Sequence, residues 1–259
     1  MKDTETYNTA SKNAPTPSTE GNHPSGKGTL YLMPVPMSDA APGTVLPASN
    51  IDLTKSIKYF IVENVRSARR FLKRCDPSIV IDELHFEVLN IDTPPEQVDG
   101  MLRPLYDGHD MAIISEAGCP AIADPGALAV AAAQRNGMKV TPLVGPSSIL
   151  MALMGSGFNG QSFAFRGYLP IKPEERQAAI RRMEKLIHSD DQTQIFIETP
   201  YRNNKLIDTL TRTLKGATKL CVASDITGPD ERIITRTVTD WSKTKYNYDK
   251  IPTIFLLYK

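Results

Sequence analysis

The stretch from Met111 to Gly126 reads MAIISEAGCPAIADPG, and it decides the fold of this chain. Its first four residues are apolar, which is typical of a short buried strand, and the run stops at Ser115-Glu116. The glycines, prolines and alanines that follow predict a narrow loop. Asp124-Pro125-Gly126 then predicts the start of an alanine-rich helix over 127–134, with Asp124 as its N-cap.

A loop without bulky side chains lets a ligand come close to the backbone. In open α/β sheets, ligands bind beyond the carboxyl ends of the strands, where N–H groups and helix starts face a crevice. We therefore interpret residues 115–126 as the main binding loop. The alternative is a well-packed turn between a strand and a helix that binds nothing.

The composition is that of a globular protein large enough for two domains. The chain has 259 residues, of which 41% are hydrophobic and 23% charged, and no apolar run approaches the ~20 residues of a membrane helix. Thirty Lys and Arg nearly cancel 29 Asp and Glu, so any preference for nucleic acid or membrane must come from local patches.

The cysteines and the N-terminal residues suggest the compartment in which the protein resides, and the histidines bear on metal binding. Cys75, Cys119 and Cys221 lie far apart, which favours a reducing compartment, and the histidines show no metal-ligand spacing, so we expect no metal site. Residues 1–27 are rich in Thr, Ser, Asn, Pro and Gly and lack the apolar core of a signal peptide. We expect this tail to be disordered and the protein to be cytoplasmic.

The first half of the chain alternates strands and helices around the binding loop. We expect strands at 28–33, 58–62, 78–86, 111–114 and 139–144, a four-proline loop over 33–50, and helices over 65–75, 94–106, 127–134 and 148–154. A second turn of small residues, 145–148, repeats the order of strand, turn and helix. Two such turns from neighbouring strands would line one crevice.

Residues 155–160 read GSGFNG and match the Gly-x-Gly-x-x-Gly pattern, but they follow a helix and precede a strand. A dinucleotide-binding motif needs the reverse order, so we read a helix stop and a domain linker instead. This places the first domain at 28–157 and the second at 158–259. The second domain has more strands per helix, at 162–169, 194–198, 219–226, 232–238 and 253–258, with helices over 173–188 and 203–215, which predicts mixed strand pairing.

The predicted helix 65–75 has one strongly basic side. It carries five cations within nine residues, Arg66, Arg69, Arg70, Lys73 and Arg74. Such a row could bind phosphates. The alternative is a solvated face whose last cations favour the helix C-terminus.

Five motifs then occur in a specific order. They are GTLYL at 28–32, SEAGCPAIADPG at 115–126, GPSS at 145–148, GYLP at 167–170 and ETPYR at 198–202. Together they resemble the tetrapyrrole methylase superfamily, the class III S-adenosylmethionine-dependent methyltransferases. They are most similar to the branch that methylates a ribose 2'-hydroxyl of a cytidine in small-subunit (16S) ribosomal RNA. The resemblance covers about residues 28–231.

The resemblance implies an α/β fold of two domains, a mostly parallel N-terminal sheet and a mixed C-terminal sheet, with S-adenosylmethionine bound in the cleft between them, in a homodimer. It places the donor against three segments of the chain. The cofactor-binding residues that it implies are Ser115, Glu116, Ala117, Gly118, Ala123, Asp124, Pro125, Gly126, Gly145, Pro146, Ser147, Ser148 and Pro200.

The motifs near the methyl acceptor depart from the family pattern. The family's Thr-Pro-Ile-Gly-Asn-Leu reads VPMSDA at 35–40, its Glu-Asp-Thr-Arg reads ENVR at 63–66, and its Glu-Leu-Thr-Lys reads DITG at 225–228. Two alternatives therefore stay open. One is a methyltransferase of a small molecule or tetrapyrrole, and the other is a paralogue that binds the donor without catalysis.

Methylation of a hydroxyl requires loss of its proton, and a nearby general base would assist. Glu63, Glu116, Asp124 and Glu198 are candidates. We favour Glu63 because it follows the second strand, and we keep Glu198 as a second catalytic residue. Arg66, Arg69 and Arg202 are candidate substrate-binding residues, although an arginine could equally pair with a nearby glutamate. Finally, the N–H groups of Gly118 or Gly126 could bind the donor carboxylate.

Overall fold

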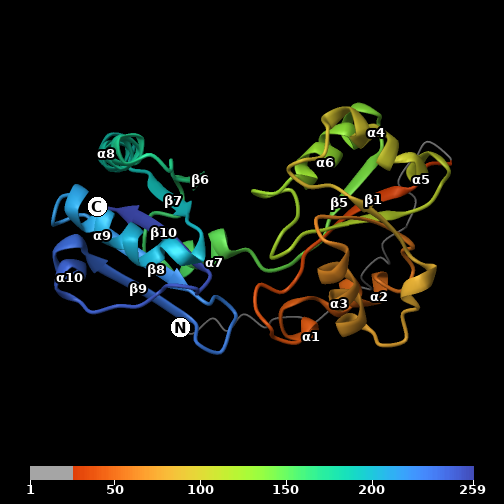
Figure 1. The fold of residues 1–259 in the computed structure, drawn as a ribbon, viewed down its shortest axis with the longest axis horizontal. Helices are drawn as coiled ribbons and strands as arrows, with labels where there is room; N and C mark the ends of the chain where they lie inside the picture. The colour runs from red at the N-terminus through yellow and green to blue at the C-terminus, as the bar shows by residue number, and fades with distance from the viewer. Residues whose placement is uncertain (1–25) are drawn as a thin grey trace, which may run out of the picture.

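The structure is a computed structural model that describes residues 26–259, so the predicted disordered tail lies outside the described residues except for its last two. The chain forms two α/β lobes, each built on a five-stranded sheet (Figure 1). The prediction of a parallel N-terminal sheet and a mixed C-terminal sheet is confirmed.

The N-terminal sheet has the order β3-β2-β4-β1-β5, and all its pairs are parallel. Both faces of the sheet are covered, so its central strand β4 is buried at all four residues. One face packs through Leu30 and Ile113 against the alanines of α6, and the other packs through Phe60 and Ala112 against α3. The strands are β1 Thr29–Met33, β2 Tyr59–Val62, β3 His85–Val88, β4 Met111–Ile114 and β5 Lys139–Pro142.

The elements of this lobe differ from the prediction in three places. Two short helices, at 42–45 and 48–53, form within and just after the predicted four-proline loop 33–50. The predicted helix 94–106 is broken into three short pieces, because Pro104 has no N–H to donate to the preceding turn. The predicted strand 78–86 begins only at His85, after a 3-10 turn. The helices are α1 Pro42–Val45, α2 Ala48–Leu53, α3 Val65–Cys75, η1 Ile81–Glu83, η2 Pro95–Gln97, α4 Val98–Met101, α5 Arg103–Tyr106 and α6 Gly126–Arg135.

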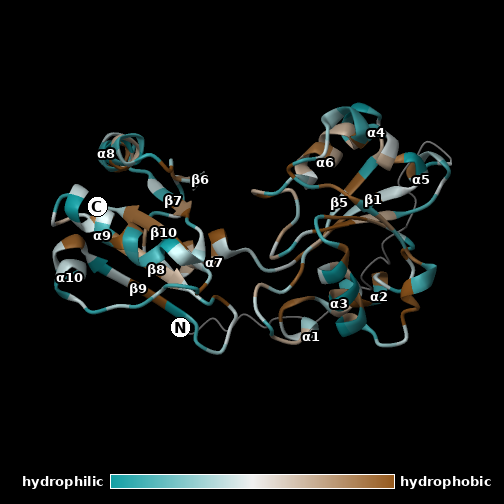
Figure 2. Ribbon diagram, in the orientation of Figure 1, coloured by the Kyte–Doolittle hydropathy of each residue, from teal (hydrophilic) through white to brown (hydrophobic). Residues whose placement is uncertain are grey.

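The C-terminal sheet has the order β6-β7-β10-β8-β9, with β6 and β7 parallel and the other pairs antiparallel. Helices α8, α9 and the unpredicted α10 enclose a core around Phe196, Phe255 and Trp241, and β10 is strongly hydrophobic (Figure 2). The elements are β6 Phe163–Tyr168, α8 Pro173–Ser189, β7 Thr193–Ile197, η3 Pro200–Arg202, α9 Asn203–Thr213, β8 Lys219–Ser224, β9 Arg232–Thr237, α10 Val238–Lys243 and β10 Thr253–Tyr258.

Helix α7, Ser148–Ser156, packs on the C-terminal sheet (Figure 1). Its Ala152 and Leu153 share a hydrophobic core with Ile195 and Leu256 of that sheet. These contacts place α7 with the second lobe, although its residues fall within the predicted first domain, 28–157. We therefore propose a domain boundary just before Ser148.

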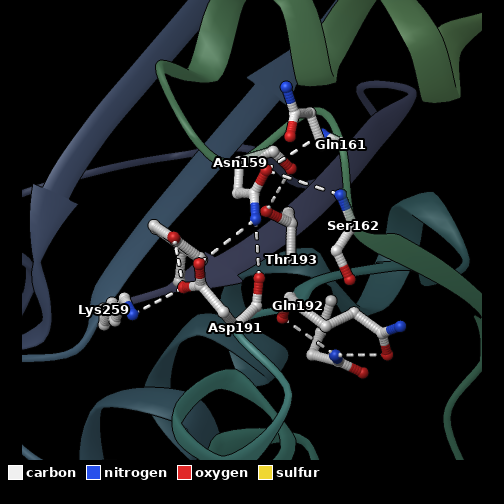
Figure 3. Close-up of polar contacts among 9 residues, drawn as sticks. Asn159, Gln161, Ser162, Asp191, Gln192, Thr193 and Lys259 are labelled. Atoms are coloured by element: carbon white, nitrogen blue, oxygen red, sulfur yellow. Dashed lines mark hydrogen bonds and ion pairs between the residues drawn. The ribbon is translucent and has the colours of Figure 1, made fainter.

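The GSGFNG segment joins α7 to β6, as its order in the chain predicts, and it ends the helix. Gly157 adopts φ +75° at the C-cap of α7. Figure 3 shows how Asn159 then fastens the turn: its side-chain oxygen accepts from Gln161 N at 2.9 Å, and its amide donates to Asp191 O at 2.7 Å. Its carbonyl accepts from Thr193 Oγ1 at 2.9 Å. These side-chain bonds make the segment a structural turn.

Candidate active site

A cleft of about 390 Å³ opens between the two lobes. The first lobe contributes the ends of β2 and β4 through Glu63 and residues 115–119, and the second turn contributes Ser147 and, at the start of α7, Ser148. The second lobe contributes apolar side chains, among them Phe165 and Ile197. The volume lies within the ~300–1,000 Å³ typical of small-molecule sites, and the lining combines apolar walls with a few polar groups.

The loop 115–126 holds an uncommon backbone conformation. Gly118, Ala121 and Ala123 all have φ between +59° and +70°, a region that residues other than glycine rarely occupy. The Asp124 carboxylate stabilises this geometry, because it accepts from Ala121 N at 2.9 Å and Gly126 N at 2.8 Å. Asp124 therefore organises the loop and bonds the first N–H of α6. The N-cap position itself is Pro125, not Asp124 as predicted.

The two N–H groups that we expected to bind the donor carboxylate are already used. Gly118 N donates to Val35 O at 3.2 Å, within a two-way bridge between these residues, and Gly126 N donates to Asp124. The expectation that they bind a ligand carboxylate is therefore wrong. The bridge to Val35 instead brings Met37 into the cleft, where its side chain lies close to Gly118.

The two loops of small residues meet, although their strands are not neighbours. Strand β1 lies between β4 and β5, which corrects the expectation of adjacent strands. Cys119 Sγ donates to Pro146 O at 3.3 Å. A Cβ on Gly145 would lie 2.2 Å from Pro34, so glycine is required there for close packing. Pro146 thus joins the two loops and Gly145 packs against the segment after β1, whereas Ser147 and Ser148 line the cleft.

Three carboxylates lie along the first-lobe wall of the cleft. Burial raises the pKa of Glu63, and the charge of Asp124 raises it further, while a backbone hydrogen bond from Glu116 opposes the shift. Burial also raises the pKa of Asp124, against the lowering effect of its backbone hydrogen bonds. Glu116 is exposed and accepts from Ser67 Oγ at 3.0 Å. Glu63 is the partly buried carboxylate of this wall that does not hold the loop 115–126 together.

Glu198 is held in an ion-pair network. Its side chain is 1% exposed and lies between Arg202 Nη2, 2.6 Å from Oε1, and Arg176 Nη2, 3.3 Å from Oε2. Thr199 N also donates to Oε1 at 2.7 Å. The geometry supports the alternative that the sequence left open, an arginine paired with a glutamate. It opposes Glu198 as a free base and Arg202 as a free substrate-binding residue.

The basic side of α3 divides into anchored and free cations. The Arg69 guanidinium lies 5.5 Å from the Phe86 ring centroid, and Arg74 Nη2 donates to the carbonyls of Asp39 and Ala40. Arg66 is exposed and forms no ion pair or side-chain hydrogen bond within residues 26–259. Arg66 is therefore the candidate substrate cation that the structure leaves available, on a helix with a hydrophilic outer surface (Figure 2).

Most other predicted residues lie in the cleft. Ser115, Glu116, Ala117, Gly118, Ala123, Asp124 and Pro200 line it, whereas Pro125 and Gly126 do not. The sequence did not predict the apolar wall of the second lobe, because a single hydrophobic residue in a strand has the same pattern whether it lies in the core or lines a cleft. The missed lining residues are Met37, Cys119, Ile122, Ile149, Phe165, Tyr168, Ile197, Ala223, Ile226, Pro252, Thr253 and Ile254.

No group of three or more His, Cys, Asp or Glu side chains in residues 26–259 has the geometry to hold a metal ion. In the same part of the chain, no helix is long and apolar enough to cross a membrane.

Comparison with known proteins identifies the family. The family model for Tetrapyrrole (Corrin/Porphyrin) Methylases matches residues 66–241. Proteins named "Ribosomal RNA small subunit methyltransferase I" from Vibrio cholerae serotype O1 and Xylella fastidiosa are 29% and 32% identical to this chain, over 81% and 76% of its length. The chain spans 69% and 67% of those two proteins, and 63% of a relative of the same name from Micromonospora olivasterospora, which is 31% identical.

Solved structures share the fold. The methyltransferase CobJ aligns over 91% of this chain and 95% of its own, with a TM-score of 0.59 and 14% identity. A cobalt precorrin-4 methyltransferase aligns over 89% and 94%, with a TM-score of 0.56 and 16% identity. These neighbours have the same two-lobed α/β architecture. With the family model and the sequence relatives, they show that this chain belongs to the tetrapyrrole (corrin/porphyrin) methylase family and is a methyltransferase.

Proposed function

We propose that this chain transfers a methyl group from S-adenosylmethionine to a ribose 2'-hydroxyl of small-subunit ribosomal RNA. The observation that carries the proposal is the cleft between the lobes, where a carboxylate of raised pKa, Glu63, and the small residues of the loop 115–126 line the same wall. The names of the sequence relatives support RNA as the acceptor class. They do not favour a tetrapyrrole acceptor or a non-catalytic paralogue.

The residues of the cleft fit an adenosyl sulfonium compound. Ala117 and Gly118 keep one wall narrow, Ile149 and Phe165 offer apolar surface for an adenine ring, and Ser147 offers a hydroxyl. The carboxylates of the first-lobe wall complement a positive sulfur. When bound, the donor would supply an electrophilic methyl group.

The protein's main contribution to such a reaction is positioning. Two rigid walls that hold an acceptor oxygen in line with the methyl carbon can lower the barrier by ~7–11 kcal/mol, as intramolecular reactions indicate. The hydrogen bonds of Asp124 to Ala121 and Gly126, and the bridge from Gly118 to Val35, make the first wall rigid. We infer that these residues determine the shape of the donor site.

Glu63 is our candidate for the general base. It lies at the end of β2 and lines the cleft. Burial raises its pKa, which makes the carboxylate a stronger base once it is ionised. Arg66, three residues further on, would bind a phosphate of the acceptor, with Arg69 behind it on Phe86. Glu198 and Arg202 would support the second wall from their ion-pair network.

A transfer assay with radiolabelled S-adenosylmethionine tests the reaction. The acceptors are undermodified small ribosomal subunits, transfer RNA and a metabolite extract. We expect label in the RNA of the small subunit, alkali-stable because a methylated 2'-oxygen cannot attack the adjacent phosphate. Label confined to the metabolite fraction would establish the small-molecule alternative. Donor binding by calorimetry with no label in any acceptor would establish the paralogue without catalysis.

Glu63→Gln tests the base. We expect kcat to fall about 100- to 10,000-fold. In the wild type, kcat/KM should rise with pH until the raised pKa is passed and then level off, because only the carboxylate accepts a proton; the variant should lose this rise. Glu116→Gln, in an exposed carboxylate of the same wall, is the matched control. It should keep the rise with pH, displaced slightly to lower pH because the charge of Glu116 contributes to the raised pKa of Glu63. An unchanged pH profile in Glu63→Gln would exclude Glu63 as the base.

The pKa shift also predicts how this variant affects stability. A carboxyl whose pKa is raised on folding contributes stability that is complete below its unfolded pKa, about 4.3, and is lost as the pH rises through the folded value. At pH 7, Glu63→Gln should therefore be at least as stable as the wild type. Its loss of activity can then be separated from unfolding by thermal denaturation at the assay pH.

The homodimer and the cytoplasmic location stay predictions.

A further inference from the structure

A second, smaller groove of about 230 Å³ adjoins the cleft on the second lobe. It runs between the end of β6 and one side of α8, lined by Pro170, Ala179 and Arg182 among others. Tyr168 lines both the cleft and this groove. The side chain of Tyr168 therefore stands where the two cavities meet.

A β-bulge presents Tyr168 at this position. Strand β6 pairs Phe165 with Ile195 but Tyr168 with Ile197, so three steps along β6 match two along β7. Gly167 takes up the bulge with φ +65°. Tyr168 is left 59% exposed, and its side chain has no hydrogen bond or ring contact to any residue that the structure describes. An aromatic ring in this state at a cavity edge is available to a ligand.

The segment that follows Tyr168 is held in place by the buried side chain of Arg176. Arg176 is buried, its Nε donates to Pro170 O at 2.8 Å, and its Nη2 pairs with Glu198. Arg176 thus ties the GYLP segment to the ETPYR segment on the floor of the second wall. Because both ties are buried, Tyr168 rests on a rigid support that needs little ordering when a ligand binds.

The groove beyond Tyr168 is basic. Arg166 is held by Gln194 Oε1 at 2.8 Å and Gln192 Oε1 at 3.1 Å, which orient its guanidinium without neutralising it. Arg182 is exposed and forms no ion pair with any described residue. None of the described side chains that line the groove is acidic. The groove therefore carries uncompensated positive charge next to an available aromatic ring.

We propose that Tyr168 is the stacking platform for a base of the acceptor RNA, and that the groove beyond it carries the adjoining strand with Arg166 and Arg182 on its phosphates. The inference rests on the proposed function and adds the path of the RNA. Sequence-specific RNA recognition commonly stacks unpaired bases on aromatic rings and places phosphates on basic side chains. Continuity of the groove with the cleft would bring the neighbouring ribose to the methyl donor.

Tyr168→Ala tests the platform, with Tyr168→Phe as the conservative variant. Stacking of one base is worth ~1–3 kcal/mol, so Tyr168→Ala should raise the Kd and KM for undermodified small subunits about 5- to 150-fold. Tyr168→Phe should remain within about threefold of the wild type, because it keeps the ring. Tyr201→Ala is the control, since Tyr201 is 75% exposed but lines neither cavity, and it should bind RNA as the wild type does.

Arg182→Ala tests the strand path, with Arg181→Ala as its neighbour on the same helix. Arg181 lines a different depression, with Lys185 and His188. Loss of one phosphate contact should reduce the slope of log K against log salt by about one in Arg182→Ala and leave it unchanged in Arg181→Ala. Equal slopes in both variants would refute the path.

The outcomes separate this inference from the proposed function. If the wild type methylates small subunits and Tyr168→Ala matches it in KM and Kd, the inference alone is wrong. If the wild type binds RNA without methylating it, the proposed function fails. The Kd of Tyr168→Ala for RNA then still tests whether Tyr168 is the platform. Tyr168→Ala that weakens only S-adenosylmethionine binding, measured by calorimetry, would assign the ring to the donor and overturn the platform. A wild type that neither binds nor methylates ribosomal RNA overturns both.

Discussion

Glu198 shows how a carboxylate in a functional motif can have a structural role. It follows β7 at the floor of the cleft, where Arg202 is hydrogen-bonded to Oε1 and Arg176 forms an ion pair with Oε2. Arg176 also bonds the Pro170 carbonyl. One buried carboxylate therefore connects the end of β7, the start of η3 and the segment that follows β6, and these together make the second wall of the cleft.

Glu198→Gln should lower the free energy of unfolding by about 3 kcal/mol, because removing one member of a buried ion pair leaves an uncompensated charge. Glu83→Gln is the matched control. The ion pair between Glu83 and Lys58 is exposed, and its loss should cost less than about 1 kcal/mol. Urea denaturation measures both. Equal effects of the two substitutions would contradict a structural role for Glu198.

At the scale of single elements, α3 accommodates a departure from the family pattern. Where the family has an aspartate, this chain has Asn64, and its side-chain oxygen accepts from Arg66 N at 2.9 Å and Ser67 N at 3.3 Å. Asparagine and aspartate are comparable N-caps. The substitution therefore preserves the start of the helix that carries Arg66 and Arg69.

Asn64→Ala should destabilise the protein by about 1 kcal/mol, since it removes both bonds to the first turn of α3. Asn64→Asp should retain the wild-type stability, or slightly exceed it through the helix dipole. Chemical denaturation of the three proteins under one set of conditions gives the comparison. A cap without energetic importance would leave Asn64→Ala indistinguishable from Asn64→Asp.

At the scale of the whole molecule, the two lobes face each other across the cleft and also touch at its edge. Ser38 Oγ, in the loop after β1, donates to Thr227 O in the loop after β8 at 2.9 Å. Both Asp225 and Thr227 have positive φ, which is rare for a β-branched residue such as threonine. These loops are two of the three segments in which the sequence departs from the family pattern, so those two departures lie together in space.

The outer side of α7 predicts where two chains would associate. Leu150 and Met154 stand one helical turn apart and are 50% and 83% exposed. We expect the wild type to be a dimer by light scattering, and Met154→Lys to dissociate it by placing a charge in an apolar contact. Ile91→Lys is the control, because Ile91 is exposed on the other lobe. Dimers that persist in Met154→Lys would move the interface elsewhere.

The order of elements was largely predictable, and so was the loop of small residues after β4. Buried strands, turn residues and helix starts depend on residues close in sequence, as the short apolar run of β4 and the glycine after α7 illustrate. The errors fell where a proline or an edge position weakens the local pattern, at the broken helix around Pro104 and the displaced strand β3. The apolar wall of the cleft was not predictable, because a residue such as Phe165 has the same local pattern in a core and in a pocket.

The sequence by itself determined the family, the two-lobed α/β architecture and the loop of small residues at 115–126. Only the tertiary structure decided which groups of those motifs are free to act. In the folded protein, the Gly118 N–H donates to Val35 O and the Glu198 carboxylate pairs with Arg176. Glu63 and Tyr168, in contrast, line the cleft. The reason is physical: local conformation depends on neighbouring residues, whereas hydrogen bonds and ion pairs are completed by partners that only folding brings within reach.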